Sequence, residues 1–254
     1  MDDERGIIEV YRDILALRNH VVIAEAFDGE EAIETYKNMQ KKPDIIIMDH
    51  RMPNINGIDA MTEIHNLDPM QCIIFVTADF QAAKNALSMG ADSFILKPFR
   101  MDNLFNAIET TLLDKENKKS RLREKLLGIV AKYSASPNKE LKNLCDSINE
   151  NVINEYLGKK SKDSADIERT SIWACEFMNI MGFNFEYQLK DEKTVVIKNT
   201  KCRWLEKFGE DPIFCSVTKC ILTRFAMRAS RDVTLDSRST LMNKDKCCLF
   251  EVKA

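Results

Sequence analysis

Short apolar runs alternate with segments of helical period over residues 1–113. The runs are rich in Ile and Val and bounded by polar residues: Val21–Ala24, Ile45–Met48, Ile73–Val76 and Ser93–Leu96. Such runs are typical of the buried strands of a parallel sheet. The segments between and after them have helical spacing: Glu30–Met39, Ile58–His65, Gln81–Ser88 and Asp102–Leu113. This alternation predicts βαβ crossovers and a doubly wound α/β fold.

A different pattern follows residue 139. It predicts three amphipathic helices, a β-hairpin around Lys190–Lys193 and two closing strands. The helices are Leu141–Leu157, Ala165–Met181 and Pro212–Arg231, and the strands are Phe183–Leu189, Thr194–Thr200, Val233–Leu235 and Cys248–Val252. Together these elements predict a smaller α+β domain.

The two patterns are joined by a charged helical stretch. From Asp102 the helical period runs on to Lys132, and Ser134–Asn138 then predicts a break. We therefore divide the chain into residues 1–118, a helical linker at 119–138 and residues 139–254. The linker could transmit a rotation, or it could be only a solvated helix. A homodimer could form through the linker or through residues 1–118, and the sequence leaves these readings open.

Charge separates the same two parts. The 254 residues carry a net charge of −3, but residues 1–113 hold 10 basic and 19 acidic residues, so the remainder has a positive balance. This asymmetry predicts different partners for the two parts. No apolar run is long enough to span a bilayer, and the acidic start is unlike a signal peptide. We expect a cytoplasmic protein with no membrane partner.

Polar residues stand where the predicted strands of the first part end. Asp49 ends one strand, Thr77 another and Lys97-Pro98 a third, while Asp2 and Asp3 precede the first helix. Ligands of doubly wound folds bind at these carboxyl ends. Converging carboxylates repel one another unless a cation joins them, and hard oxygen ligands suit Mg²⁺. A carboxylate beside Mg²⁺ can accept a phosphoryl group.

These residues, in this order and spacing, resemble the receiver domain of two-component response regulators. The matching motifs are Asp2–Glu4, Asp28–Ala32, Met48–Pro53 with Gly57, Thr77-Ala78, Gly90–Asp92 and Lys97–Phe99. The resemblance covers residues 1 to about 118. It implies a five-stranded parallel sheet, a cognate histidine kinase and phosphoryl transfer to Asp49 with Mg²⁺.

The resemblance also implies the role of each site residue. Asp3, Asp49 and the backbone carbonyl of Arg51 would ligate Mg²⁺, with Asp2 close by. Thr77 would bind a phosphoryl oxygen, Ala78 would leave room for it, and Lys97 would pair with it. Phe94 takes the position of the aromatic switch residue, and Lys97–Pro98 would be a cis peptide.

Receivers have a hydrophobic strand immediately before the acidic pair. Here Met1 directly precedes Asp2, so the first strand of the sheet is missing from this sequence. We expect the natural polypeptide to begin several residues upstream.

Seven of the eight cysteines lie after residue 118. Without a secretion signal, we expect reduced thiols or metal ligands rather than a disulfide framework. Four thiolates could hold zinc or an iron–sulfur cluster, but no C-x₂-C pair supports this, and buried free cysteines are common. The candidate thiol site comprises Cys202, Cys215, Cys220, Cys247 and Cys248.

The cysteine pattern of the second part resembles an output domain found behind receivers in methanogenic archaea. That domain is distantly similar to small-molecule-binding modules of the 4-vinyl reductase type. The matching features are Cys202 before an aromatic residue, Asp211–Cys215 opening a helix, Cys220 within that helix, and Cys247–Val252. The resemblance implies that the domain senses a ligand or binds a partner, and links phosphorylation to gene expression in an archaeon.

Arg224, Arg228 and Arg231 form a basic stripe at helical spacing. The stripe could bind DNA or another anion, or it could be a solvated face. All three histidines lie before residue 66, so we expect no histidine-based catalysis in the second part and no enzymatic output. The leading hypothesis is a phosphorylation-dependent transcription regulator. The alternative is a ligand-sensing or protein-docking module that does not bind DNA.

Overall fold

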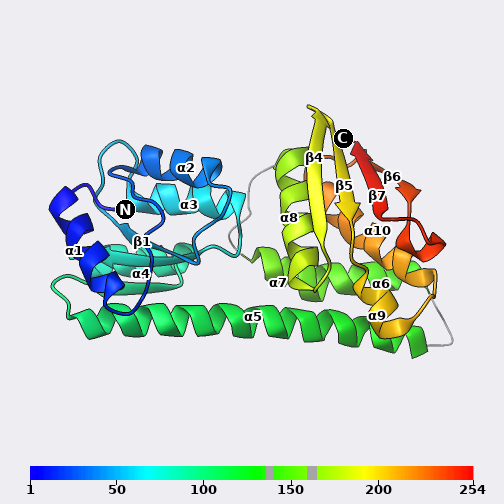
Figure 1. Ribbon diagram of the computed structural model, residues 1–254, viewed down its shortest axis with the longest axis horizontal. Coiled ribbons are helices and arrows are strands. Elements are labelled where there is room, and N and C mark those ends of the chain that lie inside the picture. The colour runs from blue at the N-terminus through cyan, green and yellow to red at the C-terminus, as the bar shows by residue number, and fades with distance from the viewer. Residues whose placement is uncertain (136–139, 159–164, 254) are drawn as a thin grey trace. The chain divides into compact units, whose positions relative to one another are not determined.

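A computed structural model describes residues 1–135, 140–158 and 165–253 (Figure 1). The described residues form two compact units, one of Met1–Lys118 together with residues 157–158, the other of Lys119–Tyr156 and the residues from 165 on. Each unit has its own sheet, parallel in the first and antiparallel in the second.

The first unit contains a three-stranded parallel sheet in the order β1-β2-β3. Its strands are β1 (Ile45–Asp49), β2 (Cys72–Thr77) and β3 (Ser93–Leu96). Ile45 lies beside Cys72, and Ile74 lies beside Ser93. This register aligns the carboxyl ends of β1 and β2, where Asp49 and Thr77 stand. Three of the four predicted strands are confirmed.

The fourth predicted strand, Val21–Ala24, is wrong. The segment is extended but belongs to neither sheet within the described residues. Val21 is 80% exposed and Ile23 48% exposed. A strand requires a neighbour for its backbone N–H and C=O groups, and no described strand lies beside this segment. Apolar composition alone could not reveal that.

Helices cover both faces of the parallel sheet. On one face α2 (Gly29–Asn38) and α3 (Gly57–Leu67) pack against Ile46 and Met48. On the other, α1 (Arg5–Ala16) and the first turns of α5 (Met101–Ala135) pack against Ile74 and Val76. Side chains in a strand alternate between faces, so consecutive residues of β1 and β2 belong to different core clusters.

Side-chain caps fix where three of these helices begin. Asp28 accepts a hydrogen bond from the Glu31 amide at the start of α2, and Asn56 caps α3. Asp79 accepts from the amides of Gln81 and Ala82 at the start of α4 (Phe80–Met89). Such caps satisfy amides that have no partner within the helix. They hold the loops that follow β1 and β2.

Helix α5 has 35 residues and contributes to both units. Leu104 and Ile108 are buried in the first core, whereas Leu122, Leu126 and Val130 are also buried but lie in the second unit. Arg123 donates through Nε and Nη2 to the carbonyl of Ile180, at 3.1 and 2.9 Å. Residues 119–135 are therefore part of the second unit rather than a separate linker. The predicted break at 134–138 falls mostly outside the described residues.

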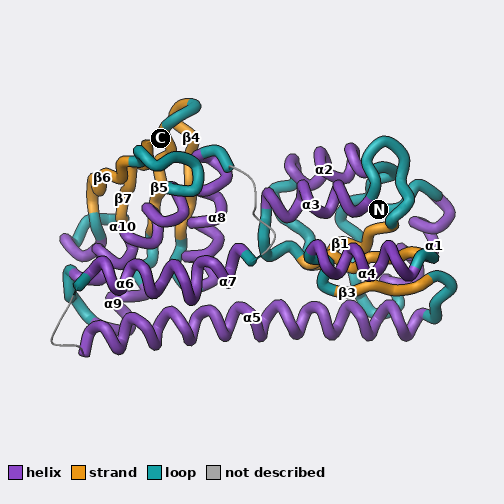
Figure 2. The backbone as a smooth tube through the Cα atoms, turned by 180° about the vertical axis from the view of Figure 1, so that it is seen from behind, coloured by secondary structure: helices purple, strands orange, loops and turns teal. Residues whose placement is uncertain are grey.

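The second unit has a four-stranded antiparallel sheet in the order β4-β5-β7-β6, as seen in Figures 1 and 2. The strands are β4 (Phe185–Asp191), β5 (Thr194–Asn199), β6 (Thr234–Ser239) and β7 (Cys248–Lys253). The helices are α6 (Leu141–Ile148), the π-helix η1 (Asn149–Ile153), α7 (Asn154–Leu157), α8 (Ile167–Ile180), α9 (Arg203–Phe208), α10 (Ile213–Ala226) and the 3₁₀ turn η2 (Leu241–Asn243). The predicted α+β architecture is confirmed.

Aromatic side chains fill the core of this unit. Tyr156, Phe177 and Phe225 pack with ring centroids 5.3–6.0 Å apart, and Trp204 donates from its indole nitrogen to Thr218 at 2.9 Å. Helix α9, which carries Trp204, was not predicted from the sequence. Among the described residues no helix combines the length and apolar character needed to cross a bilayer.

Candidate functional site

The carboxyl end of the parallel sheet brings two acidic side chains onto one ammonium group. Lys97 Nζ lies 2.6 Å from Asp49 Oδ1 and 3.0 Å from Asp2 Oδ2. Asp2 is 1% exposed and Asp49 is 7% exposed. Asp49 is the last residue of β1, Lys97 follows β3, and Asp2 precedes α1, so residues distant in sequence meet at one sheet edge.

The backbone around Asp49 is tightly held. The Arg51 amide donates to Asp49 Oδ2 at 2.6 Å, and the Gly57 amide donates to the His50 carbonyl at 3.0 Å. A Cβ atom on Gly57 would lie 2.1 Å from the Asp49 carbonyl oxygen. Only glycine permits this close approach of α3 to the end of β1.

The two neighbouring carboxylates keep Lys97 protonated. Burial alone would lower the pKa of Lys97, but its hydrogen bonds to Asp49 and Asp2, together with their negative charges, outweigh burial. The pKa of Lys97 therefore lies above its ordinary value, and the ammonium stays charged near neutral pH. The ammonium therefore balances one of the two neighbouring carboxylate charges.

Thr77 lies at the same edge, 3% exposed. Its Oγ1 accepts a hydrogen bond from the Asp79 amide at 3.1 Å, so its own hydroxyl hydrogen can be donated elsewhere. The Thr77 carbonyl accepts from the Lys97 amide at 2.8 Å, which joins the two residues through the backbone. The neighbouring Ala78 is small and exposed.

Two further expectations concern β3 and the residues after it. The Lys97–Pro98 peptide is cis, as predicted. Phe94 is half-buried, and its ring packs edge-on against Phe80 with centroids 6.4 Å apart.

The predicted metal ligands are only partly gathered. Asp2 and Asp49 converge on Lys97, whereas the Asp3 side chain is exposed. The predicted ligand of Arg51 is its backbone carbonyl; its side chain lies 3.9 Å from Asp79. Asp2, rather than Asp3, is thus the acidic residue buried against Lys97. Mg²⁺ binds through one or two carboxylates and retains several waters, so Asp2, Asp49 and the Arg51 carbonyl fit this ion chemically. No cluster of three ligating side chains is preassembled anywhere in the described ranges.

The predicted thiol site is divided in the structure. Cys202 begins α9, Cys215 lies in the first turn of α10, and Cys248 begins β7. Burial raises the pKa of Cys248, and interactions with Cys202 and Cys215 raise it further. The Leu241 amide donates to Cys248 Sγ at 3.2 Å. Cys247 is half-exposed. Cys202, Cys215 and Cys248 are thus close enough to interact electrostatically, whereas Cys220 is bonded elsewhere, and among the described residues no group of three or more potential ligands is placed to hold a metal.

Cys220 instead forms a disulfide with Cys145, which corrects the expectation of reduced thiols. Helices α6 and α10 bring the two Cα atoms within 5.9 Å, inside the range for such bonds. Cys145 was not predicted as a partner, because the two residues are 75 positions apart and only helix packing joins them.

The predicted arginine stripe is largely engaged within the second unit. Arg224 pairs with Asp146 of α6, and Arg228 Nη2 donates to Asn154 Oδ1 at 2.7 Å. Burial lowers the pKa of Arg228. Arg231 is exposed. Helix α10 ends at Ala226 rather than at Arg231, so only Arg224 of the three lies within it, and Arg224 and Arg228 are turned toward α6 and α7.

Two protein families account for the chain. Residues 1–109 match the family described as response regulator receiver domain, and residues 108–253 match methanogen output domain 1. Both resemblances inferred from the sequence motifs are confirmed at this level.

Known relatives match the first unit. Chemotaxis protein CheY of Thermotoga maritima is 40% identical over 110 residues, covering 42% of this chain and 90% of that protein. CheY of Halobacterium salinarum is 36% identical over 114 residues, 44% of this chain and 92% of that protein. A CheX–CheY–BeF₃–Mg²⁺ complex from Borrelia burgdorferi has 30% identity and a TM-score of 0.41, covering 43% of this chain and 83% of that one. The chain thus belongs to the response regulators, with a receiver domain followed by a methanogen output domain 1.

Proposed function

We propose that Asp49 accepts a phosphoryl group from a histidine kinase in the presence of Mg²⁺, and that phosphorylation changes the activity of the second unit in transcription regulation. The observation that carries the proposal is the ion pair of a buried Asp49 with Lys97, next to Asp2 and Thr77. An isolated surface aspartate would have none of these neighbours.

The transfer can be written with this chain's own residues. An oxygen of Asp49 attacks the phosphorus, the P–N bond of the kinase phosphohistidine breaks, and the released imidazole keeps the bonding electron pair. Negative charge then lies on the phosphoryl oxygens, where the Lys97 ammonium and the Thr77 hydroxyl can neutralise it. Water later hydrolyses the acyl phosphate and restores Asp49. We expect no other catalysis.

Asp2, Asp49 and the Arg51 carbonyl are the groups that would hold Mg²⁺. When bound, the ion neutralises charge on the phosphoryl oxygens. The carboxylates of Asp2 and Asp49 are paired with Lys97 in the structure, so Mg²⁺ binding requires Lys97 to share these carboxylates with the ion or to move away from them. The affinity of the site for Mg²⁺ therefore depends on the position of the Lys97 side chain.

Phosphorylation of Asp49 also changes what Lys97 contacts. The carboxylate that now pairs with the ammonium loses its charge, and the phosphoryl group carries about two charges farther from the backbone. We expect the Lys97 ammonium to move toward the phosphoryl oxygens. Because its amide bonds the Thr77 carbonyl, this movement is linked to the end of β2 and the cap of α4. Helix α5 carries buried residues of both units, so it offers a route for the signal.

Intact mass spectrometry after incubation with Mg²⁺ and acetyl phosphate tests the proposal. We expect one added phosphoryl group on the full chain and none on Asp49→Asn, which keeps the shape of the side chain. Asp59→Asn, in an exposed position near the start of α3, is the matched control and should label normally. Equal labelling of the Asp49 variant would contradict the proposal.

The second candidate is a ligand-sensing or protein-docking output without DNA contact. The inward contacts of Arg224 and Arg228 favour it, because they remove two of the three arginines expected to meet phosphates. Titration of the phosphorylated protein with genomic DNA fragments at several salt concentrations distinguishes an output that binds DNA from one that does not. Affinity that falls steeply with salt supports DNA contact, and no binding at low salt supports the second candidate.

A further inference from the structure

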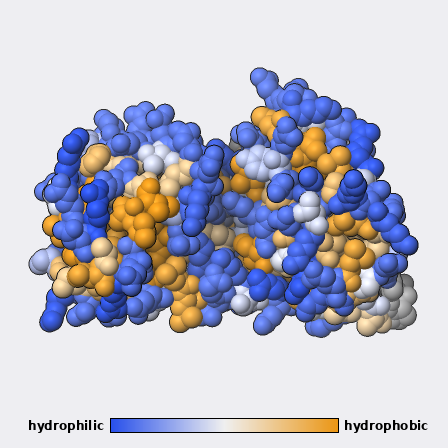
Figure 3. All heavy atoms as spheres, in the orientation of Figure 1, coloured by the Kyte–Doolittle hydropathy of each residue, from blue (hydrophilic) through white to orange (hydrophobic). Residues whose placement is uncertain are grey.

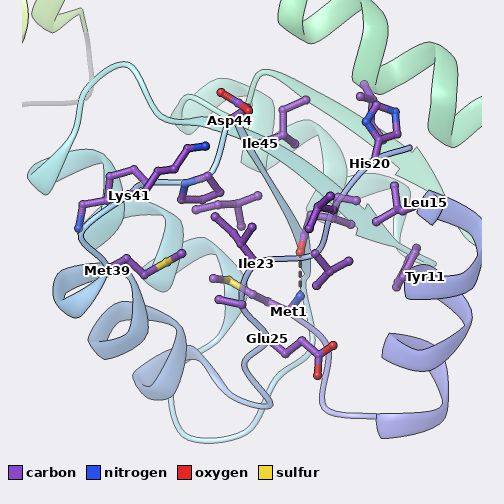
Figure 4. A pocket seen from close by; sticks show the side chains of 18 of the residues that line it. Met1, Tyr11, Leu15, His20, Ile23, Glu25, Met39, Lys41, Asp44 and Ile45 are labelled. Carbon is purple, nitrogen blue, oxygen red and sulfur yellow. Dashed lines mark hydrogen bonds between the residues drawn. The ribbon is translucent and has the colours of Figure 1, made fainter. Parts of the chain in front are cut away.

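The two sheets end differently. In the first unit, the side of β1 that faces away from β2 borders a groove of about 430 Å³, where the Met1 nitrogen donates to the Ile47 carbonyl (Figure 4). In the second unit the described sheet ends at β4, which Figure 1 shows as its outermost strand. Every residue from Glu186 to Asp191 is exposed. An exposed edge of this kind can pair with another strand.

The hydrogen bonds of Phe185 show which backbone groups of β4 point to the open side. The Asn179 side chain donates through Nδ2 to the Phe185 carbonyl at 2.9 Å, and its Oδ1 accepts from the Phe185 amide at 2.6 Å. Both backbone groups of Phe185 therefore point away from β5. Alternate residues of an antiparallel strand direct these groups to the same side, so those of Tyr187 and Leu189 also point away from β5. Asn179 takes the place of a neighbouring strand at Phe185 only.

Two large side chains at this edge are only partly covered. Tyr187 lies opposite Ile197 and Leu189 opposite Val195, and both β5 residues are buried. Residues directly opposite one another lie on the same face, so Tyr187 and Leu189 lie on the core face of the sheet. They are nevertheless 40% and 43% exposed, because no described strand lies beyond β4. A further strand beside β4 would cover them.

Charged side chains lie on the opposite face of β4. Glu186 is exposed, and Lys190 Nζ lies 3.0 Å from Glu251 Oε1. Because the Lys190 side chain is 61% exposed, its ammonium can meet a second carboxylate without leaving the first. Figure 3 shows hydrophilic side chains, with apolar ones among them, on the visible side of this unit. The edge strand thus offers both charges and apolar surface to a neighbour.

The other edge of this sheet, formed by β6, is built differently. Its apolar side chain, Leu235, is half-buried, and the register with β7 shifts between Ser237 and Ser239. Such a bulge bends an edge strand and hinders pairing. In β4 the shift comes after Leu189, next to the hairpin turn. Strand β4 is therefore the edge better suited to a partner.

The sequence of β4 is complementary to itself in one register. Two copies related by a two-fold axis would pair antiparallel, and the residue on the axis determines every other pair. With Gln188 on the axis, Tyr187 lies opposite the partner's Leu189. Their outward-pointing backbone groups then meet, and an aromatic side chain packs on an aliphatic one. On the other face Glu186 lies opposite the partner's Lys190, which brings opposite charges together.

Neighbouring registers lack this agreement. With Tyr187 on the axis, Phe185 would have to bond to the partner's Leu189, but Asn179 already bonds both backbone groups of Phe185. With Leu189 on the axis, the two opposite charges would be separated. The backbone and the charges therefore select the same register.

We propose that two copies of this chain associate through β4, antiparallel and with Gln188 on the two-fold axis, so that the sheet of one copy continues into the other. The partner is a second copy because residues 186–190 supply both halves of the apolar pair and both halves of the charged pair. The inference goes beyond phosphoryl transfer and does not depend on it.

Sedimentation equilibrium of the full, unphosphorylated chain tests this, and we expect a dimer whose population rises with concentration. Glu186→Lys and Lys190→Glu should each weaken association by on the order of tenfold, because each places like charges opposite one another. An equimolar mixture of the two variants should associate as the parent does, since opposite charges then meet at both pairs. Glu210→Lys, in the exposed loop before α10, makes the same charge change as Glu186→Lys and should behave as the parent.

Three outcomes would each overturn the proposal: a chain that stays monomeric, single variants that associate as the parent does, or a mixture that stays as weak as its components. Rescue in the mixture cannot come from the Glu251 contact that Lys190→Glu removes, because that contact lies within one chain.

Cross-linking provides a second measurement that leaves the charges unchanged. Residues paired on the axis at Gln188 would have Cα atoms about 4.5 Å apart, within the range of a disulfide. Mild oxidation of Gln188→Cys should therefore give a covalent dimer on a non-reducing gel, whereas Glu210→Cys should give no more than the parent. Equal cross-linking of the two variants would contradict the proposed register. Neither measurement uses phosphorylation, so failure here and failure of the proposed function remain distinct.

Discussion

Lys97 and Asp49 stand at the ends of different strands, with Nζ 2.6 Å from Oδ1, and the same ammonium reaches Asp2. One cation thus holds two buried carboxylates together. Any divalent ion that binds these carboxylates competes with the lysine for them.

Replacing Lys97 with methionine should strengthen Mg²⁺ binding. In the absence of Mg²⁺ it should lower the free energy of unfolding, because Asp2 and Asp49 lose their cation. Loss of one positive charge a few ångströms from the ion is worth about 1–4 kcal/mol, so the Kd should fall by on the order of tenfold. Titration calorimetry measures it. Lys84→Met, at an exposed position on α4, is the control and should bind as the parent does. An unchanged Kd in Lys97→Met would mean that Asp2 and Asp49 do not bind the ion.

Gly57→Ala should destabilise the receiver by about 2 kcal/mol or more, because the added Cβ would overlap the Asp49 carbonyl oxygen. Urea unfolding measures the free energy. Gly6→Ala provides the comparison, since Gly6 lies in α1 with nothing within 4 Å of its added Cβ. That variant should gain roughly 0.5–1 kcal/mol from helix propensity. If both variants behaved alike, the close approach of α3 to β1 would be refuted.

Glu251 makes the second unit sensitive to acid. Hydrogen bonds from Arg238 and Lys190 lower the pKa of Glu251 from 4.5 to about 2. A carboxyl whose pKa is lowered on folding contributes stability above its unfolded pKa and loses it as pH falls through the folded value. The Tm of the parent should therefore drop between pH 4.5 and about 2.

Glu251→Gln should have a lower Tm than the parent at pH 7 and a flatter profile below pH 4.5. Glu192→Gln, in the exposed hairpin turn, should retain the slope of the parent. A slope that survives in Glu251→Gln would assign the acid sensitivity to other groups.

Reduction of the Cys145–Cys220 bond should destabilise the second unit. Closing a loop of 75 residues restricts the unfolded chain, which corresponds to roughly 4 kcal/mol in the chain-entropy description. Thermal unfolding with and without a reductant measures the difference. Cys145→Ser should match the reduced parent and no longer respond to reductant, whereas Cys247→Ser, which changes a half-exposed free thiol, should still respond. Eight titratable thiols in the unreduced parent would show that the bond is absent.

The receiver site could be predicted because its residues lie at strand ends, which short sequence motifs mark. Asp49, Thr77 and Lys97 are each local signals, and the parallel sheet brings them together. Which of Asp2 and Asp3 turns inward is a matter of backbone orientation at the start of α1. The Asp2 side chain also accepts a hydrogen bond from the Glu4 amide at 3.1 Å, a contact that composition does not reveal.

In the second unit, the partners of several predicted site residues come from helices distant in sequence, so the sequence pattern could not identify them. The stripe of Arg224 and Arg228 has the correct helical spacing, but α6 and α7 supply Asp146 and Asn154 on that face. Cys220 has the spacing of a site residue, yet its partner lies in α6. In the first unit, Val21–Ala24 has the composition of a strand, yet no strand among the described residues pairs with it. Periodicity identifies a face and leaves its neighbour unspecified.

The unbroken course of α5 through Lys118 and Lys119 bears on how such proteins can be recombined. Each residue added to a helix turns everything after it by about 100° and advances it by about 1.5 Å. An insertion of one or two residues would therefore change the helical phase of the residues after it by about 100° or 200°, whereas seven added residues nearly restore the phase.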